Sequence, residues 1–214
     1  YVNLEDDNLF IELRLGLNHG IFQFESHGMN NLIRGMQVEK FEELVACNAL
    51  YRPGPMGIGA HEEFIMNKFN PEKIKLVHPA LEPILRETNG VLVFQEQLMF
   101  IADRIGGMGL GKGDNLRRYM DKASKIIARH SAGEKLTEDE LNNSNWKGFQ
   151  QYWNMFLEGA AAQGYDKKEV DKIKEWVIQY LGYSFNKSHS LSYSYLAMQT
   201  LFLKHYYPTE FYTA

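Results

Sequence analysis

The sequence predicts a mainly α-helical fold with a few short β-strands. Most segments carry apolar residues at helical spacing, and short glycine- or proline-containing stretches separate them. Only two short runs have the character of strands. The chain has 214 residues, 44% of them hydrophobic and 23% charged, which is ordinary for a globular protein with a real core. We expect one mostly helical domain without internal repeats.

The two predicted strands are short. Residues Gly20–Phe24 (GIFQF) alternate apolar and polar side chains, and Val91–Phe94 is a continuous apolar run. Ser26 is placed to cap the helix that follows the first run. One apolar face is then expected at i, i+3, i+4 and i+7, made of Met29, Leu32, Ile33 and Met36. A second helix over residues 38–50 should stop before Arg52-Pro53, because proline disfavours a helical residue before it.

Further helices are expected over residues 78–90, 95–105, 116–130, 149–164 and 167–182, and a last one starts near Ser188. Residues 106–115 form a glycine-dense loop, after which Asp114 or Asn115 caps the next helix. The polar stretch 131–147 reads as a loop with one helical turn. Its capping box pairs Thr137 with Glu140, and Asp166 with Glu169 repeats that pattern further on.

The composition excludes several classes of protein. A net charge of −4 argues against a surface that coats nucleic acid all over, although a local basic groove remains possible. Cys47 is the single cysteine and lies in an apolar helical pattern, so we expect a buried thiol in a reducing, cytoplasmic compartment. No apolar run approaches the length of a membrane span. The chain starts without Met and ends as an apolar segment begins, so we expect a piece of a longer protein.

The glycine-dense loop matches part of a nucleotide-binding motif. Gly106, Gly111 and Lys112 fit G-x-x-x-x-G-K, but Gly113 stands where a P-loop needs Ser or Thr to hold magnesium. The preceding segment has a helical period, whereas a P-loop follows a strand. A connection between two helices is therefore the favoured interpretation.

A basic stripe follows the loop. Arg118, Lys122, Lys125 and Arg129 stand at i, i+4, i+7 and i+11, on one face of the expected helix. Such a stripe fits phosphate contacts, but a solvated helix face is the more common meaning of this pattern. Arg117 has Asp121 four residues on and can pair with it.

The motif FNKSHS, residues 185–190, precedes the last helix. With Ser188 as its cap, this helix would offer free backbone N–H groups and the positive end of its dipole, beside Lys187 and His189. That combination favours a phosphate or another polyanion, and an ordinary polar cap is the equal alternative. The helix is apolar nearly all round, which suggests burial.

Other chemistry has little support in the sequence. The seven histidines lack ligand spacing, and no strand-like Asp-x-Asp could hold two magnesium ions. YRPGPMG, residues 51–57, reads as a turn, and Arg52 is the one residue in it whose side chain could take part in binding or chemistry. The chain thus shows anion-binding groups but no evident catalytic acid, base or metal ligand.

Six blocks occur in a specific order: GIFQFESHGMNNLI, ALYRPGPMG, GVLVFQEQLM, LGKGDNLRRYM, FLEGAAAQG and GYSFNKSHSLSYSYLAMQTLFLKHYYPTEF. Together they closely resemble the fingers of the bacterial C-family replicative polymerases, the DNA polymerase III alpha subunits. The resemblance covers residues 20–214, with a polar insertion at about 131–147, and makes residues 1–19 an acidic lead-in from the preceding palm domain.

The resemblance implies a part of an enzyme that performs DNA-directed DNA synthesis. The palm of this family carries three aspartates that bind two Mg²⁺ ions; these should precede this chain, so no cofactor is expected here and the isolated chain should be inactive. The implied partners are dNTP, template–primer DNA and other replisome subunits. Arg117 and Arg118 would clamp the triphosphate, with Asn186, Lys187, Ser188 and His189 near the same pocket. Possible further nucleotide or DNA contacts are Arg52, Lys122, Lys125 and Arg129.

The sequence departs from the family pattern after LRRYM. Asp121 replaces the usual glycine, DKASKIIARH replaces a lysine run, and the following connection is longer than expected. These differences suggest a divergent bacterial or phage member and put the DNA contacts in doubt. A non-catalytic helical module that binds protein or nucleic acid remains the alternative.

Overall fold

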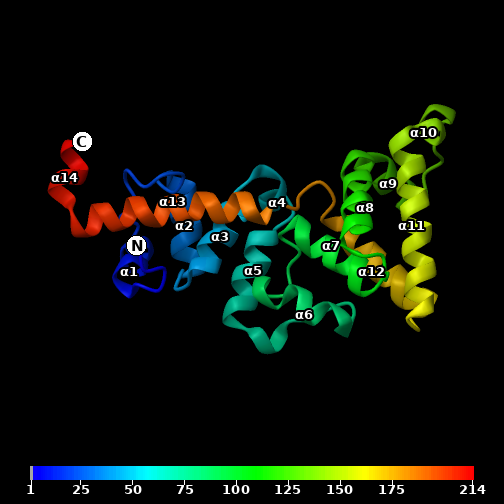
Figure 1. Ribbon diagram of the computed structural model, residues 1–214, viewed down its shortest axis with the longest axis horizontal. Coiled ribbons are helices and arrows are strands. Elements are labelled where there is room, and N and C mark those ends of the chain that lie inside the picture. The colour runs from blue at the N-terminus through cyan, green and yellow to red at the C-terminus, as the bar shows by residue number, and fades with distance from the viewer. Residues whose placement is uncertain (1) are drawn as a thin grey trace. The chain divides into compact units, whose positions relative to one another are not determined.

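The computed structural model describes residues 2–214, and this part of the chain contains helices but no β-strand (Figure 1). It folds into two compact units. The first unit combines the chain up to Glu72 with residues 185–214, and the second comprises residues 73–184. The chain therefore leaves the first unit, forms the second, and returns.

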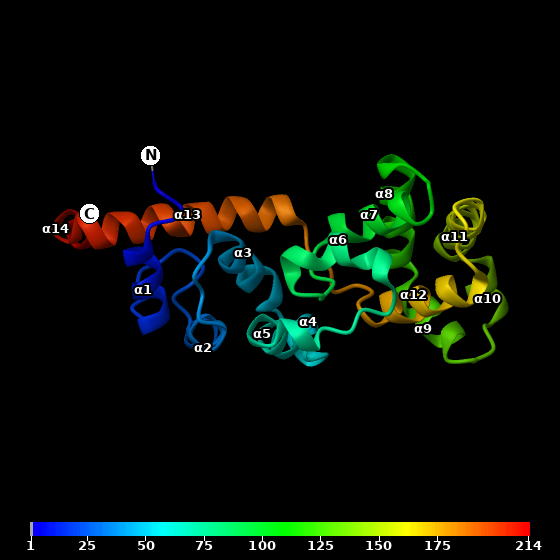
Figure 2. The same cartoon turned by 90° about the horizontal axis from the view of Figure 1, so that it is seen from below.

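The first unit is built from seven α-helices and one short 3₁₀-helix among the described residues. These are α1 (Asp7–Leu15), α2 (His27–Met36), α3 (Phe41–Leu50), α4 (Pro53–Gly57), α5 (Ala60–Phe69), η1 (Pro71–Lys73, which reaches the boundary), α13 (Lys187–Tyr206) and α14 (Pro208–Thr213). Helices α1 and α3 pack against the long helix α13, and α2 packs against α1, α3 and α5 (Figures 1 and 2).

Small side chains allow α13 to pack closely on α3. Ser190, Ser194 and Ala197 are buried on one face of α13, and the Ser190 hydroxyl donates to the carbonyl oxygen of Val45 at 2.6 Å. The expectation that α13 is buried all round is wrong, because Leu191 and Leu196 are exposed on another face. The cause is that only one side of a helix can meet a single partner layer.

The acidic N-terminal segment is an integral part of the first unit. Asp6 caps α1 by accepting from the backbone N–H of Asn8 at 3.0 Å. Oε1 of Glu12 lies 2.6 Å from Nδ1 of His205 in α13, within hydrogen-bond distance. Lys204 donates to the carbonyl oxygens of Leu17 and His19. The segment that ends at residue 19 is thus tied to α13 by side-chain contacts.

The predicted strand Gly20–Phe24 is wrong. The segment is a series of turns in which Gln23 has a φ of 65°, and Phe24 donates its backbone N–H to the carbonyl oxygen of Ile21 at 3.0 Å. Ile21 and Phe24 are both buried, three positions apart, whereas a strand would bury every second residue. The prediction of a strand at Val91–Phe94 is likewise wrong, because this segment is buried but irregular. The side-chain oxygen of Gln97 accepts hydrogen bonds from the backbone N–H groups of Val93 and Phe94.

The second unit contains the remaining helices. These are η2 (Pro79–Leu81), α6 (Glu82–Leu85), η3 (Arg86–Thr88), α7 (Gln95–Arg104), α8 (Leu110–Lys122), α9 (Ser124–Ser131), α10 (Glu138–Asn142), α11 (Ser144–Ala162) and α12 (Lys167–Gln179). Helix α8 packs between α7 and α11, and α12 contacts α9 and α11.

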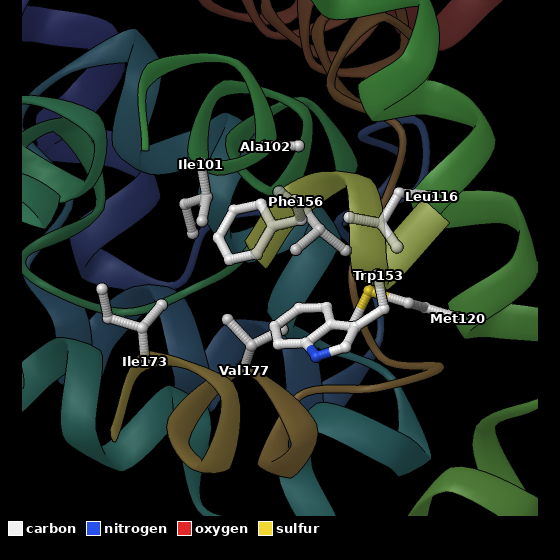
Figure 3. Close-up of a pocket in the computed structure, with 9 residues that line it drawn as sticks. Ile101, Ala102, Leu116, Met120, Trp153, Phe156, Ile173 and Val177 are labelled. Carbon is white, nitrogen blue, oxygen red and sulfur yellow. The ribbon is translucent and has the colours of Figure 1, made fainter. Parts of the chain in front are cut away.

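The core of the second unit is aromatic. Trp146, Phe149, Trp153 and Phe156 follow one another along α11, with neighbouring ring centroids 4.8–6.0 Å apart. Figure 3 shows Trp153 and Phe156 among aliphatic side chains around a cavity of about 10 Å³. This space has a purely apolar lining and holds about one water molecule at most, so it is a packing defect rather than a ligand site.

Most local sequence signals are confirmed. Ser26 accepts from the N–H of Met29 at 3.3 Å, and both predicted capping boxes form, at Thr137 and at Asp166. The predicted apolar face of α2 is buried. No helix in the described part of the chain has both the length and the apolar character needed to span a membrane.

Several predicted boundaries are wrong. Helix α8 begins at Leu110 rather than after Asp114, so most of the predicted glycine loop is helical. The expected helix 116–130 is broken at Ala123, and residues 144–147 of the predicted polar loop belong to α11. The turn after Arg52 forms the short helix α4, which proline at its first position permits.

Candidate functional site

The two arginines of α8 have different environments. Arg118 has a side chain that is 61% exposed, and its Nε donates to Asp114 at 2.8 Å. Arg117 has a side chain that is only 14% exposed and is held between two carboxylates. It donates twice to Asp114, at 2.8 and 3.0 Å, and once to Asp121 at 2.9 Å. Arg118 is therefore the member of the pair that presents its charge to solvent.

The pKa values of the two carboxyl groups in this cluster, Asp114 and Asp121, are shifted in opposite directions. Burial opposes ionisation of Asp114, but the hydrogen bonds and charges of Arg117 and Arg118 together outweigh burial and hold the pKa of Asp114 below its ordinary value. The side chain of Asp121 is about as exposed as that of Asp114, at 25% and 26%. Burial raises the pKa of Asp121, and Arg117 and the backbone of Gly182 offset this only in part. The ionised form is therefore favoured at Asp114 by its arginine partners and disfavoured at Asp121 by burial.

The basic stripe is not continuous. Lys122 ends α8, Ala123 breaks the helix, and Lys125 lies in α9. The side chains of Lys122 and Lys125 are both exposed. Arg129 pairs with Glu134 at 2.7 Å and also with Glu140. Its guanidinium therefore stabilises the polar insertion and is less available to a ligand. These pairs raise the pKa of Arg129 above its ordinary value. The sequence stripe therefore reduces to Arg118, Lys122 and Lys125 as exposed cations.

The cap of α13 is Asn186, not Ser188. The Asn186 side chain accepts from the backbone N–H of His189 at 2.7 Å, so α13 begins at Lys187. Asparagine caps as well as serine does, and its position three residues before His189 suits the bond. Ser188 and His189 are exposed in the first turn. Lys187 and His189 thus stand at the positive end of a 20-residue helix, as the motif predicted.

A line of rings and one cation flanks this helix start. The Arg52 guanidinium lies over the Phe185 ring at 4.4 Å, and Arg52 Nε donates to the carbonyl oxygen of Ala49 at 2.8 Å. Burial lowers the pKa of Arg52. The His189 ring contacts Phe185 and Tyr193, with centroids 5.4 and 4.1 Å away. The fold therefore brings Arg52 to the FNKSHS motif within the first unit.

The rings of this line, Phe185, Tyr193 and Phe22, were not predicted from the sequence. Phe22 contacts Tyr193 with a centroid distance of 5.3 Å. A usable signal was present, because His189 and Tyr193 stand four residues apart and so share a face of α13, and Phe185 stands four residues before His189. The predicted anion-binding residues divide between the units: Arg117 and Arg118 belong to the second unit, and Arg52 and Asn186–His189 belong to the first.

Comparison with known proteins decides the family. The family model described as the bacterial DNA polymerase III alpha subunit finger domain matches residues 1–142. The chain belongs to this family. Similar curated proteins, each named "DNA polymerase III subunit alpha", include those of Treponema pallidum, 41% identical over 98% of this chain, and Halalkalibacterium halodurans, 40% identical over 99%. The protein of Borreliella burgdorferi is 41% identical over 99% of this chain.

The chain spans 16% of the Treponema protein and 17% of each of the other two. The range matched by the finger-domain model begins at residue 1 and so includes the acidic segment expected to lead in from the palm. That range also covers Arg52, Arg117 and Arg118, whereas the FNKSHS motif lies beyond it. The curated relatives, however, match along nearly the whole chain.

The remaining sequence hypotheses concern metals and nucleophiles. The P-loop interpretation is wrong for this finger domain, because Gly111, Lys112 and Gly113 lie in the first turn of α8 and a helix precedes them. Among residues 2–214, no group of three or more His, Cys, Asp or Glu side chains is placed to hold a metal ion. Cys47 is fully buried, and burial raises its pKa far above the ordinary value, as a structural thiol requires.

Proposed function

We propose that this finger domain is part of a replicative DNA-directed DNA polymerase, a cytoplasmic nucleotidyltransferase, in which it helps to bind the incoming dNTP and the template–primer DNA. The observation that carries the proposal is Arg118. Its side chain is 61% exposed, yet Asp114 holds the guanidinium at 2.8 Å, so a permanent positive charge stands at a fixed place on α8. Such a group suits a triphosphate, whose charge must be neutralised during nucleotidyl transfer.

The start of α13 supports the same chemistry in the first unit. Lys187 and His189 adjoin the backbone N–H groups of the first helical turn, where the helix dipole favours an anion. Arg52 and the rings around His189 surround this helix start. We propose that Asn186 acts as the cap that shapes the turn and that Lys187, Ser188 and His189 contact the nucleotide.

The Mg²⁺ ions and catalytic aspartates of the proposed reaction belong to parts of the polymerase outside this chain, and so do its contacts with other replisome subunits. In this proposal, the residues present here bind and orient phosphate and hold no metal ion. The purified 214-residue chain is therefore expected to show no polymerase activity. Templated nucleotide addition by that chain alone would contradict this part of the proposal.

Nucleotide binding tests the proposal directly. We expect the unfolding temperature of the purified chain to rise with dNTP concentration, because a ligand that binds only the folded state stabilises it. Arg118→Ala should abolish this rise. Arg86→Ala is the matched control, since Arg86 is an exposed arginine of the same unit that pairs with Glu82. A dNTP-dependent rise that survives in Arg118→Ala would overturn the role of Arg118.

DNA binding gives a second prediction. Lys122→Ala in the complete polymerase should make the slope of log K against log salt less negative by about one. The reason is that each lost phosphate contact releases roughly one counterion fewer on binding. Arg129→Ala should change the slope less, since Glu134 and Glu140 already pair with Arg129. The measurement is a salt titration of template–primer affinity. Equal slopes for Lys122→Ala and the unmodified enzyme would mean that Lys122 is only a solvated residue.

One observation favours the alternative of a non-catalytic interaction module. Phe41, Leu191, Tyr195 and Leu196 line an open apolar groove of about 550 Å³ in the first unit. An exposed apolar surface of this kind often contacts another protein. The dNTP titration separates the two functions, because an interaction module has no reason to bind dNTP through Arg118.

A further inference from the structure

Arg117 has few donors left for a ligand. A guanidinium has five N–H donors, and three are already used by Asp114 and Asp121. The side chain is 14% exposed, compared with 61% for its neighbour Arg118. Binding a triphosphate through Arg117 would break charge-assisted hydrogen bonds and leave a buried carboxylate without its partner.

The second carboxylate extends the network to another segment. Asp121 accepts a hydrogen bond from the backbone of Gly182 as well as from Arg117. Gly182 lies in the connector that follows α12, residues 180–184, and has a φ of 76°, a conformation that favours glycine. This connector leads directly to Phe185 and the FNKSHS motif. Arg117, Asp121 and Gly182 therefore link α8 to the connector, all within the second unit.

The first carboxylate links Arg117 to Arg118. Asp114 Oδ1 accepts from Arg117, and Asp114 Oδ2 accepts from Arg118 at 2.8 Å. With both oxygens occupied, Asp114 fixes the relative orientation of the two guanidinium groups. Arg117 thus buttresses the carboxylate that holds the exposed arginine.

We propose that Arg117 is a positioning residue and not a triphosphate ligand: through Asp114 it orients Arg118, and through Asp121 it holds the connector at Gly182. The part that concerns Arg118 rests on the proposed function. The link to Gly182 does not, since it is a property of the second unit alone.

Hydrogen exchange on the purified chain tests the link to Gly182. We expect the Gly182 amide to exchange at least tenfold faster in Arg117→Ala and in Asp121→Ala, whereas amides of α7 should keep their rates. Asp139→Ala is the control, because Asp139 is an exposed carboxylate of the same unit. If either alanine variant fails to fold, Arg117→Lys and Asp121→Asn take its place. Unchanged exchange at Gly182 in the folded variants would overturn the link.

A double-mutant cycle in the complete polymerase tests the role of Arg117 in nucleotide binding. If Arg117 positions Arg118, Arg117→Ala should raise the KM for dNTP several-fold, and adding Arg117→Ala to an Arg118→Ala enzyme should change KM little. If Arg117 is a direct ligand, Asp121→Gly should free it and lower KM, and the effects of the two arginine substitutions should multiply. That result would overturn the proposal.

The two tests fail independently. An unchanged KM in Arg118→Ala would refute the proposed function while leaving the exchange of Gly182 as a valid measure of the link. Normal exchange at Gly182 combined with a raised KM in Arg118→Ala would refute the connector role while preserving the proposed function.

Discussion

Gly159→Ala should destabilise the second unit by at least about 3 kcal/mol, although alanine is normally preferred to glycine within a helix. A Cβ atom on Gly159 of α11 would lie 1.7 Å from the carbonyl oxygen of Gly106 and 2.7 Å from its carbonyl carbon. Both are backbone atoms, so no side-chain rotation can relieve the overlap. The helix would have to move away from the turn after α7 and disturb the packing of Phe156.

The measurement is the free energy of unfolding in urea, compared with that of the unmodified chain. Gly111→Ala is the matched control. Gly111 also lies in a helix, α8, but a Cβ atom there would meet nothing within 4 Å. Gly111→Ala should therefore stabilise the chain by up to about 1 kcal/mol, the opposite sign. A Gly159→Ala variant as stable as the parent would show that α11 and the turn at Gly106 do not meet as described.

Arg118→Ala in the complete polymerase should lower kcat/KM for dNTP by about 10- to 100-fold, equivalent to about 1.4–2.7 kcal/mol of transition-state stabilisation. We expect KM to rise, because a cation bound to the triphosphate is lost. We expect kcat to fall as well, because charge on the leaving pyrophosphate develops in the transition state and is no longer neutralised.

Single-nucleotide incorporation on a primed template measures both constants. Arg118→Lys separates charge from geometry: it should recover part of the loss in KM but less of the loss in kcat, because lysine cannot donate two fixed hydrogen bonds to one phosphate. Arg86→Ala should leave both constants unchanged, since Arg86 pairs with Glu82 on the surface. A kcat/KM for Arg118→Ala equal to that of the parent would end the assignment of this residue.

Local sequence rules were sufficient for three helix starts, those capped by Ser26, Thr137 and Asp166. Thr137 with Glu140, and Asp166 with Glu169, satisfy orphan N–H groups within four residues, so no distant part of the chain is needed. The buried face of α2 was predictable for the same reason, because helical spacing alone places Met29 and Ile33 together. The resemblance of ordered motifs, rather than any of these rules, indicated the family that the comparisons then established.

Local rules failed where a backbone choice depended on distant contacts. Residues 20–24 alternate as a strand does, but no other strand in the described chain offers a ladder, and burial of Ile21 and Phe24 selects turns instead. The cap of α13 was placed two residues late because Asn186 and Ser188 are equally good caps by type. The break at Ala123 likewise has no proline or glycine to announce it.

The sequence by itself determined the helical character of the chain, the caps at Ser26, Thr137 and Asp166, and the identity of its basic residues. Only the tertiary structure decided which of those residues are available. Arg117 and Arg118 are adjacent and chemically identical, but Asp114 and Asp121 enclose one and leave the other exposed. Arg52 reaches Phe185, far along the chain, because α13 returns to the first unit. The pairing of Arg117 with Asp121 follows from their spacing within α8, but exposed fractions and contacts such as that of Arg52 with Phe185 depend on packing between distant segments, which no local pattern of residues specifies.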